Sequence, residues 1–272
     1  MTASIATPIS LAARTSGRLP GLGALVRKDL GEWTHGKRAV VVLIVVGLFM
    51  ILGAANSWIN AWVIANVPEA ATAGADKVIS LAPLDNVLTA VASQIFVFAA
   101  IFAAMSLLVG ERDSGTLAWV ASKPVSRTSI LVSKWVSATA VLWVAAGLVP
   151  LALTAAVVTV LYGVPPIGAV VAAGLGIGAA IGLFVAIALA ASTFSASQPA
   201  VAGIGFAAFL LPMMVNAIVP FDLAPYEPTS ILSWVMGVAT GAPVGIATPI
   251  AWVVGMLGLG ALASRRMATL EL

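Results

Sequence analysis

The chain has 272 residues, of which 61% are hydrophobic and only 8% are charged, and its mean hydropathy is +1.11. Soluble globular chains are about 45–50% apolar and about 25% charged. The 13 basic and 10 acidic residues are too few to cover a water-exposed surface of this size, so much of the surface must face lipid. The composition excludes a soluble protein and predicts an all-α, polytopic membrane protein.

Several kinds of chemistry are excluded by the residue types that are missing. The chain has no cysteine and a single histidine, His35, which rules out disulfides, thiol nucleophiles, iron–sulfur clusters, haem and His/Cys zinc sites. The stretch Gly31 to Lys37 matches most of a P-loop, but Arg38 stands where the magnesium-binding hydroxyl is required and no strand precedes it. We expect no catalytic residues, no bound cofactor and no metal in this chain. The scattered basic residues do not indicate nucleic-acid binding.

The N-terminal region divides into a tail and an apolar, periodic segment. Residues 1–20 lack the apolar core of a secretory signal and predict a disordered tail. Residues 21–272 read as a single transmembrane domain. From residue 22, apolar residues recur at helical spacing, which favours an amphipathic helix on the cytoplasmic leaflet. A frayed linker held by basic charge is the alternative. The apolar positions are Leu22, Leu25, Val26, Leu30 and Trp33.

Six apolar segments are long enough to cross a bilayer, which requires about 20 helical residues. They cover residues 39–62, 87–109, 130–161, 167–192, 199–219 and 243–263. Basic residues set the orientation, because six of them precede the first segment, four surround the connection between the second and third, and two follow the sixth. With six spans these twelve fall on one side, and Lys77 alone falls on the other. The asymmetry predicts that both termini are cytoplasmic and that the protein lies in the cell membrane.

No charged residue or histidine lies in the middle of a predicted span. Membrane-buried charges usually relay protons, bind ions or sense voltage, so their absence counts against a proton-coupled carrier or an ion pump. The main polar side chains of the spans are Asn56, Asn60, Gln94 and Asn216. They are candidates for a transport pathway, although hydrogen bonding between helices is the favoured alternative.

Two further segments bear on packing. A row of small residues recurs every four positions in the fourth span, which permits close helix approach, first within one subunit and alternatively between subunits. The row comprises Gly174, Gly178, Gly182, Ala186 and Ala190. Residues 220–242 contain three prolines followed by an apolar run, which suits either an interfacial or re-entrant segment or an ordinary loop.

The longest polar stretch between spans runs from Gly110 to Trp135. Asp113 or Ser114 can cap a short helix in which Leu117, Val120 and Ala121 share one face. Ser126 offers a second cap into the third span. A short cytoplasmic helix held between two spans can serve as a handle for a cytoplasmic motor.

At these residues the sequence resembles the permease subunits of ABC type-2 transporters. The resemblance rests on E-x-x-x-G-T-L with Glu111, Gly115 and Thr116, on P-V-S-R from Pro124 to Arg127, and on Lys134. The six-span layout and the basic, amphipathic lead-in fit the same family. The chain departs from the family at Ala118, Trp119 and Val120, where many relatives continue with an acidic residue and leucines.

The resemblance implies a half-transporter without an ATPase site of its own. Two permease chains, forming a homodimer, would each dock the loop helix onto a separate ATP-binding subunit that holds ATP and Mg, and would export an apolar or amphipathic substrate. The coupling residues it implies are Glu111, Asp113, Gly115, Thr116, Leu117, Pro124 and Arg127. Membrane lipid is a further expected partner. A membrane scaffold that recruits cytoplasmic proteins and a secondary carrier stay open as alternatives.

Overall fold

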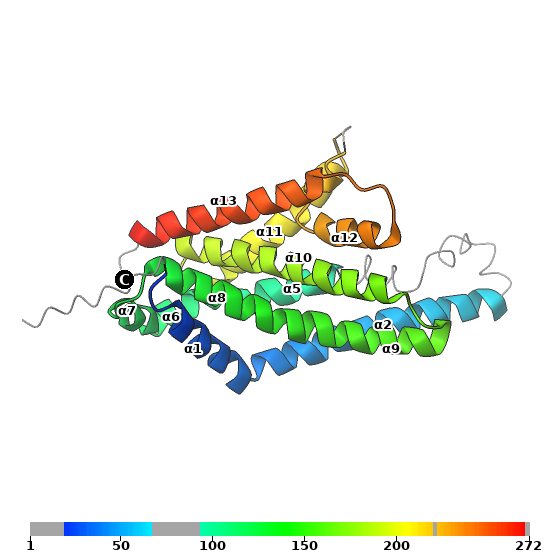
Figure 1. Cartoon of the computed structure of the whole chain (residues 1–272), viewed down its shortest axis with the longest axis horizontal. Helices are drawn as coiled ribbons and strands as arrows, with labels where there is room; N and C mark the ends of the chain where they lie inside the picture. Colours follow the sequence, from blue (N-terminus) through cyan, green and yellow to red (C-terminus); the bar gives the residue numbers. More distant parts are fainter. Residues whose placement is uncertain (1–18, 67–92, 220–221, 270–272) are drawn as a thin grey trace, which may run out of the picture.

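The computed structural model describes residues 19–66, 93–219 and 222–269, and every regular element within these ranges is a helix (Figure 1). The elements in chain order are α1 Leu22–His35, α2 Arg38–Asn66, α5 Ser93–Ala104, α6 Val109–Asp113, α7 Thr116–Ala121, α8 Arg127–Leu142, the π-helix η3 Trp143–Leu148, α9 Val149–Tyr162, α10 Ile167–Phe194, α11 Gln198–Asn216, the 3-10 helix η4 Ala224–Tyr226, α12 Ser230–Thr240 and α13 Ala247–Thr269. The predicted all-α class is confirmed. The predicted tail, apart from residues 19 and 20, lies outside the described residues.

Six helical segments are long and apolar enough to cross a membrane, as the sequence predicts. They are Arg38–Ala55, Ile95–Asp113, Arg127–Val160, Ile167–Phe194, Gln198–Asn216 and Ala247–Thr269. Each contains at least about 18 residues, close to the roughly 20 that a bilayer core requires. Large apolar side chains of α2 and α13 point away from the bundle, among them Ile44, Leu48, Val254 and Leu257. These exposed faces are the surfaces that lipid would cover.

The third span is one continuous rod made of α8, η3 and α9. Pro150 is the second residue of α9, and because proline has no N–H it removes one helical hydrogen bond from the preceding turn. The π-helical turn from Trp143 to Leu148 comes directly before it. A π-turn inserts one extra residue into the hydrogen-bonding pattern, so the two features together mark the irregular point of this span.

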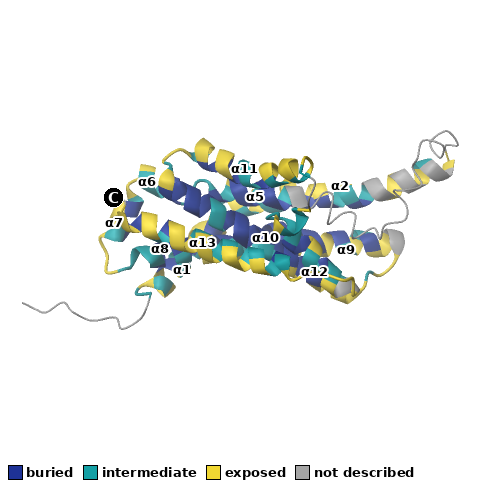
Figure 2. Cartoon of the chain, turned by 90° about the horizontal axis from the view of Figure 1, so that it is seen from above, coloured by how far each residue is buried: buried dark blue, intermediate teal, exposed yellow. Residues whose placement is uncertain are grey.

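Helix α10 lies at the centre of the bundle and contributes many of its buried residues (Figure 2). Its small-residue row faces α8 and η3 of the same chain. The indole N–H of Trp143 donates to the carbonyl of Gly174 over 2.7 Å, and that of Trp135 donates to the carbonyl of Gly182 over 2.9 Å. A Cβ added at Gly178 would lie 2.7 Å from Nε1 of Trp143. The row therefore packs helices within one subunit, the first of the two alternatives.

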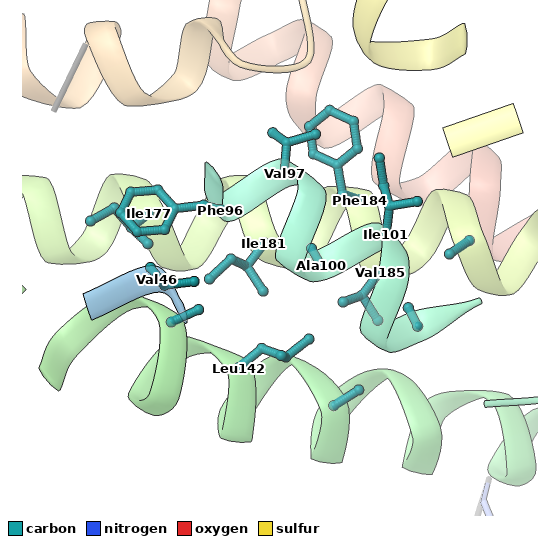
Figure 3. Packing of buried hydrophobic residues seen from close by; sticks show 14 of the residues in the cluster. Val46, Phe96, Val97, Ala100, Ile101, Leu142, Ile177, Ile181, Phe184 and Val185 are labelled. Carbon is teal, nitrogen blue, oxygen red and sulfur yellow. The ribbon is translucent and has the colours of Figure 1, made fainter. Parts of the chain in front are cut away.

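The main hydrophobic core fills the space between α10 and its neighbours. Figure 3 shows Phe96 and Ile101 of α5, Leu142 of α8, and Ile177 and Phe184 of α10 facing one another. All five side chains are buried. These contacts fix the positions of the spans relative to one another.

The segment 222–240 forms a separate layer on α10. It contains η4 and α12, and α12 packs alongside α10 (Figure 1). Leu232 and Met236 are buried in this contact, and a Cβ at Gly176 of α10 would lie 2.9 Å from Cδ1 of Leu232. The apolar run of this region is therefore a helix folded back against the bundle and not an ordinary loop; its position as an interfacial or re-entrant segment of the membrane stays a prediction.

Different elements meet at the two ends of the bundle. At one end α1, α6, α7 and the C-terminal end of α13 come together (Figure 1); we call this the polar end. The linker between α9 and α10 lies at the opposite end, as does the start of α13; we call this the distal end.

Candidate functional site

The connection between the second and third spans is a helical hairpin, residues 109–126, formed by α6 and α7. Gly115 joins the two helices with φ +72°, a left-handed conformation that favours glycine because it has no Cβ. Gly115 is also the N-cap of α7, without a side-chain cap, whereas Asp113 is the last residue of α6. The prediction that Asp113 or Ser114 caps the loop helix is wrong, because the positive-φ glycine starts the helix one residue later. The predicted cap at Ser126 is confirmed, since its side chain accepts from the backbone N–H of Ser129.

One face of the hairpin is anchored in a second hydrophobic cluster. Leu117 and Val120 are buried there against residues of α1, α8 and α13. The neighbours include Leu25, Ile130 and Met267. Leu117, expected among the coupling residues, therefore points into the protein and holds α7 in place.

Beneath the hairpin, charged side chains of α1, α6 and α8 form a buried ion-pair network. Glu111 accepts from Lys28 through Oε1 and from Lys134 through Oε2, both over 2.8 Å. Asp29 lies 3.8 Å from the Lys134 ammonium and accepts from the hydroxyl of Ser133 over 2.8 Å. Lys134 is 4% exposed and Asp29 5% exposed. These contacts join three elements that are far apart in the sequence.

The ion pairs of the network favour the charged form of Lys28. Burial alone would lower the pKa of the Lys28 ammonium, but its hydrogen bonds to Glu111 and Glu32 and the charge of Asp29 raise that pKa above its ordinary value. Removing one partner of a buried ion pair typically costs about 3–5 kcal/mol, because the remaining charge has no compensation. The hairpin is therefore held on α1 and α8 by interactions that are costly to break.

Three acidic side chains of this network lie close enough together to resemble a metal centre. Carboxylate oxygens of Asp29, Glu32 and Glu111 lie within 4.8 Å of one another. Both oxygens of Glu111, however, already accept from lysine ammonium groups, and the two lysines neutralise two of the three negative charges. The geometry supports a structural ion-pair network rather than a cation site.

Two arginines connect the hairpin region to the ends of other spans. Arg112 donates to the carbonyl of Ser192 near the C-terminus of α10 over 3.2 Å. Arg127 donates to the carbonyls of Met267 and Ala268 in the last turn of α13 over 2.8 and 3.1 Å. Cations near a helix C-terminus satisfy unpaired carbonyls and interact favourably with the helix dipole. These hydrogen bonds attach the hairpin region to the C-terminal ends of α10 and α13.

The outer face of the hairpin is exposed; we call its exposed residues the tip. They are Asp113, Ser114, Gly115, Ala118, Trp119, Ser122, Lys123 and Pro124. Trp119 is 61% exposed, and the Lys123 ammonium lies 4.6 Å from the centroid of its ring. An exposed tryptophan beside a cation is a typical anchor for a protein partner.

The structure separates the expected coupling residues into two groups. Asp113, Gly115 and Pro124 lie at the tip, and Thr116 lies beside it with its hydroxyl 2.9 Å from that of Ser114. Glu111, Leu117 and Arg127 instead bind other parts of the same chain. They belong to the base that supports the tip.

Sequence reasoning missed the paired partners of Glu111 and the exposed position of Trp119. Lys134 lies one to two turns inside an apolar span, and Asp29 lies on the same face of α1 as Leu25 and Trp33. A charged residue at a position that the apolar periodicity predicts to be buried requires a partner. Lys134 and Asp29 occupy such positions, so the periodicity could have indicated this network.

Of the four polar side chains predicted as candidates for a pathway, the structure describes that of Asn216. The Asn216 carbonyl oxygen accepts from the backbone N–H of Leu223 over 2.8 Å, so it fixes the chain after α11. The side chains of Asn56, Asn60 and Gln94 lie outside the described part of the structure.

The family model described as ABC-2 family transporter protein matches residues 24–263, from α1 into α13. The chain belongs to this family. The match includes the hairpin, the first five candidate spans and the sixth as far as residue 263, and it confirms the resemblance seen in the sequence. An ABC-2 permease is the membrane component of an ABC transporter and not its ATPase. No curated protein matches the chain.

Proposed function

We propose that this ABC-2 permease exports an apolar or amphipathic substrate, driven by ATP that a separate ATP-binding subunit holds with Mg and hydrolyses. The uncharged centres of the spans support an external energy source, because a gradient-driven carrier usually keeps ionisable groups there. The hairpin provides the connection to that source.

The single observation that carries the proposal is the contrast within the hairpin. Its base is fixed by Glu111, Lys134 and Asp29 in buried ion pairs, whereas its tip presents Trp119 and Lys123 to the surroundings. The base of the hairpin is fixed, and its exposed tip carries an aromatic ring and a cation. Such an element is suited to bind a partner and to transmit the partner's movement to the spans. The tip is the proposed docking site.

The proposed orientation places the polar end and both termini in the cytoplasm of a cell-membrane protein. The basic side chains at this end support it, since cytoplasmic segments near span ends carry an excess of lysine and arginine. Arg112, Lys123, Arg127 and Arg266 all belong to this end. An ATP-binding subunit in the cytoplasm would then reach the tip directly.

The proposed mechanism moves several spans together. Force applied to the tip would pass through Glu111 to α1 and α8, through Arg112 to α10, and through Arg127 to α13. The π-turn before Pro150 gives the third span a place to bend. Two such permease chains, paired as a homodimer, would alternate access to a pathway between them.

The test removes the tip side chains without touching the base. Trp119→Ala with Lys123→Ala is expected to lower ATPase stimulation in the permease–ATPase complex, measured in proteoliposomes. A central interface anchor is worth about 2 kcal/mol or more, or roughly 30-fold in affinity. The thermal midpoint of the permease should not change, because both side chains are exposed.

The matched control is Trp62→Ala, which removes an exposed tryptophan of α2. It should leave ATPase stimulation at the wild-type value. Full stimulation in the Trp119→Ala, Lys123→Ala variant would contradict docking at the tip.

A further inference from the structure

A large apolar groove lies between α2 and α5. Its volume is about 910 Å³, in the range of about 300–1,000 Å³ typical of ligand sites. Val41, Val45 and Phe49 of α2 form one side, and Phe98 and Phe102 of α5 form the other. Neither the proposed coupling site nor the family match assigns a role to this groove.

The α5 wall of the groove is held in place by α11, which lies beside it (Figure 2). Phe206 meets the rings of Phe98 and Phe102 edge to face, with centroids 5.2 and 5.4 Å apart, and Phe209 meets Phe98 at 5.7 Å. Edge-to-face pairs add to the stability of packed aromatic rings. The groove is therefore pre-formed rather than dependent on the mobility of single side chains.

One end of the groove is polar and positively charged; we call it the mouth. Lys37, Arg38, Ser106 and Gln198 line it. The Arg38 guanidinium donates to the hydroxyl of Ser106 over 3.0 Å, and the Lys37 ammonium has no acidic partner within the described ranges. Gln198 begins the 19-residue helix α11, whose N-terminus adds partial positive charge. No carboxylate side chain lines the groove.

We propose that the groove binds an anionic phospholipid of the surrounding bilayer. Its phosphate would lie at the mouth, between Lys37, Arg38 and the start of α11, and one acyl chain would run along Val41, Val45 and Phe49. From Arg38 to Phe49 the helix rises about 16 Å at 1.5 Å per residue. This length matches half of a bilayer core about 30 Å thick, so the groove spans one leaflet.

Charge favours a lipid over a second copy of the chain at this surface. A two-fold contact presents the same patch from both subunits. It would bring two copies of Lys37 and Arg38 into one interface without a groove carboxylate to pair with them, and unpaired like charges oppose association. An anionic headgroup supplies the missing negative charge.

The test measures lipid selectivity of the purified full chain. The protein is exchanged into micelles with equimolar phosphatidylglycerol and phosphatidylcholine, and native mass spectrometry counts each bound lipid. A basic side chain near a membrane surface contributes about a fivefold preference for anionic lipid. Wild type is therefore expected to retain phosphatidylglycerol over phosphatidylcholine by on the order of tenfold or more, and Lys37→Gln with Arg38→Gln should retain them about equally.

Two further variants separate the mouth from the groove. Val45→Trp, on the lipid-facing side of α2, should reduce retention of both lipids by filling the groove. Arg265→Gln with Arg266→Gln removes the same charge from α13 and should keep the wild-type ratio. An unchanged lipid ratio after the Lys37 and Arg38 substitutions would overturn the proposal.

A second copy as the occupant gives a different result. The chain has no cysteine, so Val45→Cys introduces a single thiol, and a disulfide between two copies through it would overturn the lipid proposal. The measurement in micelles requires neither an ATPase nor a membrane orientation. Its failure is therefore distinguishable from failure of the proposed transport function.

Discussion

Helix α7 in the hairpin and helix α12 after the fifth span are both short, and both lie outside the six spans. Different interactions hold them against the bundle. Helix α7 buries Leu117 and Val120, rests on the ion pairs of Glu111, and exposes Trp119. Helix α12 contains no charged residue and buries Leu232 against α10. Each helix has a left-handed glycine at one end, Gly115 or Gly241. The difference therefore lies in what fixes each helix.

Helices α7 and α12 also differ in how the acidic residue near each of them is paired. At the polar end each oxygen of Glu111 accepts from a lysine. Before α12, burial and then the nearby charge of Asp222 raise the pKa of Glu227 above its ordinary value, and no described cation pairs with Glu227. Charge pairing fixes the hairpin, whereas apolar contact fixes α12. Ion pairs hold two groups in a defined direction, whereas apolar contacts do not. In the proposed function, the hairpin receives force from a water-soluble partner, and directional contacts suit that role.

The largest expected effect comes from breaking the network under the hairpin. Lys134→Met removes the buried ammonium that pairs with Glu111 and Asp29 and leaves Lys28 as the only cation of the network beside both carboxylates. We therefore expect a loss near the lower end of about 3–5 kcal/mol in the free energy of unfolding. The thermal midpoint in detergent is the measurement. Adding Glu111→Gln should recover part of the loss, because one of the two carboxylate charges is then removed.

Lys123→Met is the control for Lys134→Met, since Lys123 is an exposed cation at the tip. Its midpoint should stay within the range of about 0.5 kcal/mol seen for surface substitutions. Equal midpoints for Lys134→Met and wild type would mean that ion pairs do not fix the hairpin.

A smaller effect is expected from the apolar contact of α12. Leu232→Ala should cost close to the lower end of about 2–5 kcal/mol, because it opens a cavity against α10 while lipid tails reduce the transfer contribution. Val238→Ala removes an exposed side chain of the same helix and should leave the midpoint unchanged. If the two variants lost equal stability, burial of Leu232 would not be what holds α12.

The smallest effect isolates the turn of the hairpin. A Cβ at Gly115 has open space around it, as does one at Gly110 in α6, but only Gly115 has a positive φ. Gly115→Ala should therefore cost about 1–2 kcal/mol from backbone strain alone, measured as a lowered midpoint.

Gly110→Ala is the matched control and should be neutral or slightly stabilising, because alanine favours a helix. A larger loss for Gly110→Ala than for Gly115→Ala would show that the left-handed turn does not determine the shape of the hairpin.

The sequence predicted the spans well because lipid imposes a simple rule on each of them separately. About 20 apolar residues suffice, and no knowledge of neighbours is needed. The Ser126 cap was predictable for the same reason, since its partner, Ser129, is only three residues away. The fold class required only local patterns.

The hairpin and the ion pairs beneath it were only partly predictable, because their arrangement depends on contacts between distant segments. Lys28 and Glu111 are 83 positions apart, so the sequence pattern could not show that Glu111 points inward. The amphipathic helix α1 was expected to lie on the leaflet, and the helix is present, but its Leu25 and Trp33 face is buried in the protein. Periodicity shows that a face is apolar and not which surface covers it.

The central claim is that the hairpin tip receives the ATP-binding subunit. The most direct measurement is cross-linking from a single introduced thiol to lysines of a co-expressed ATP-binding subunit, with a reagent that joins cysteine to amine. Trp119→Cys should give a cross-linked product. Ile246→Cys, which places a thiol at an even more exposed position at the distal end, should give none. A product from Ile246→Cys together with none from Trp119→Cys would contradict the account.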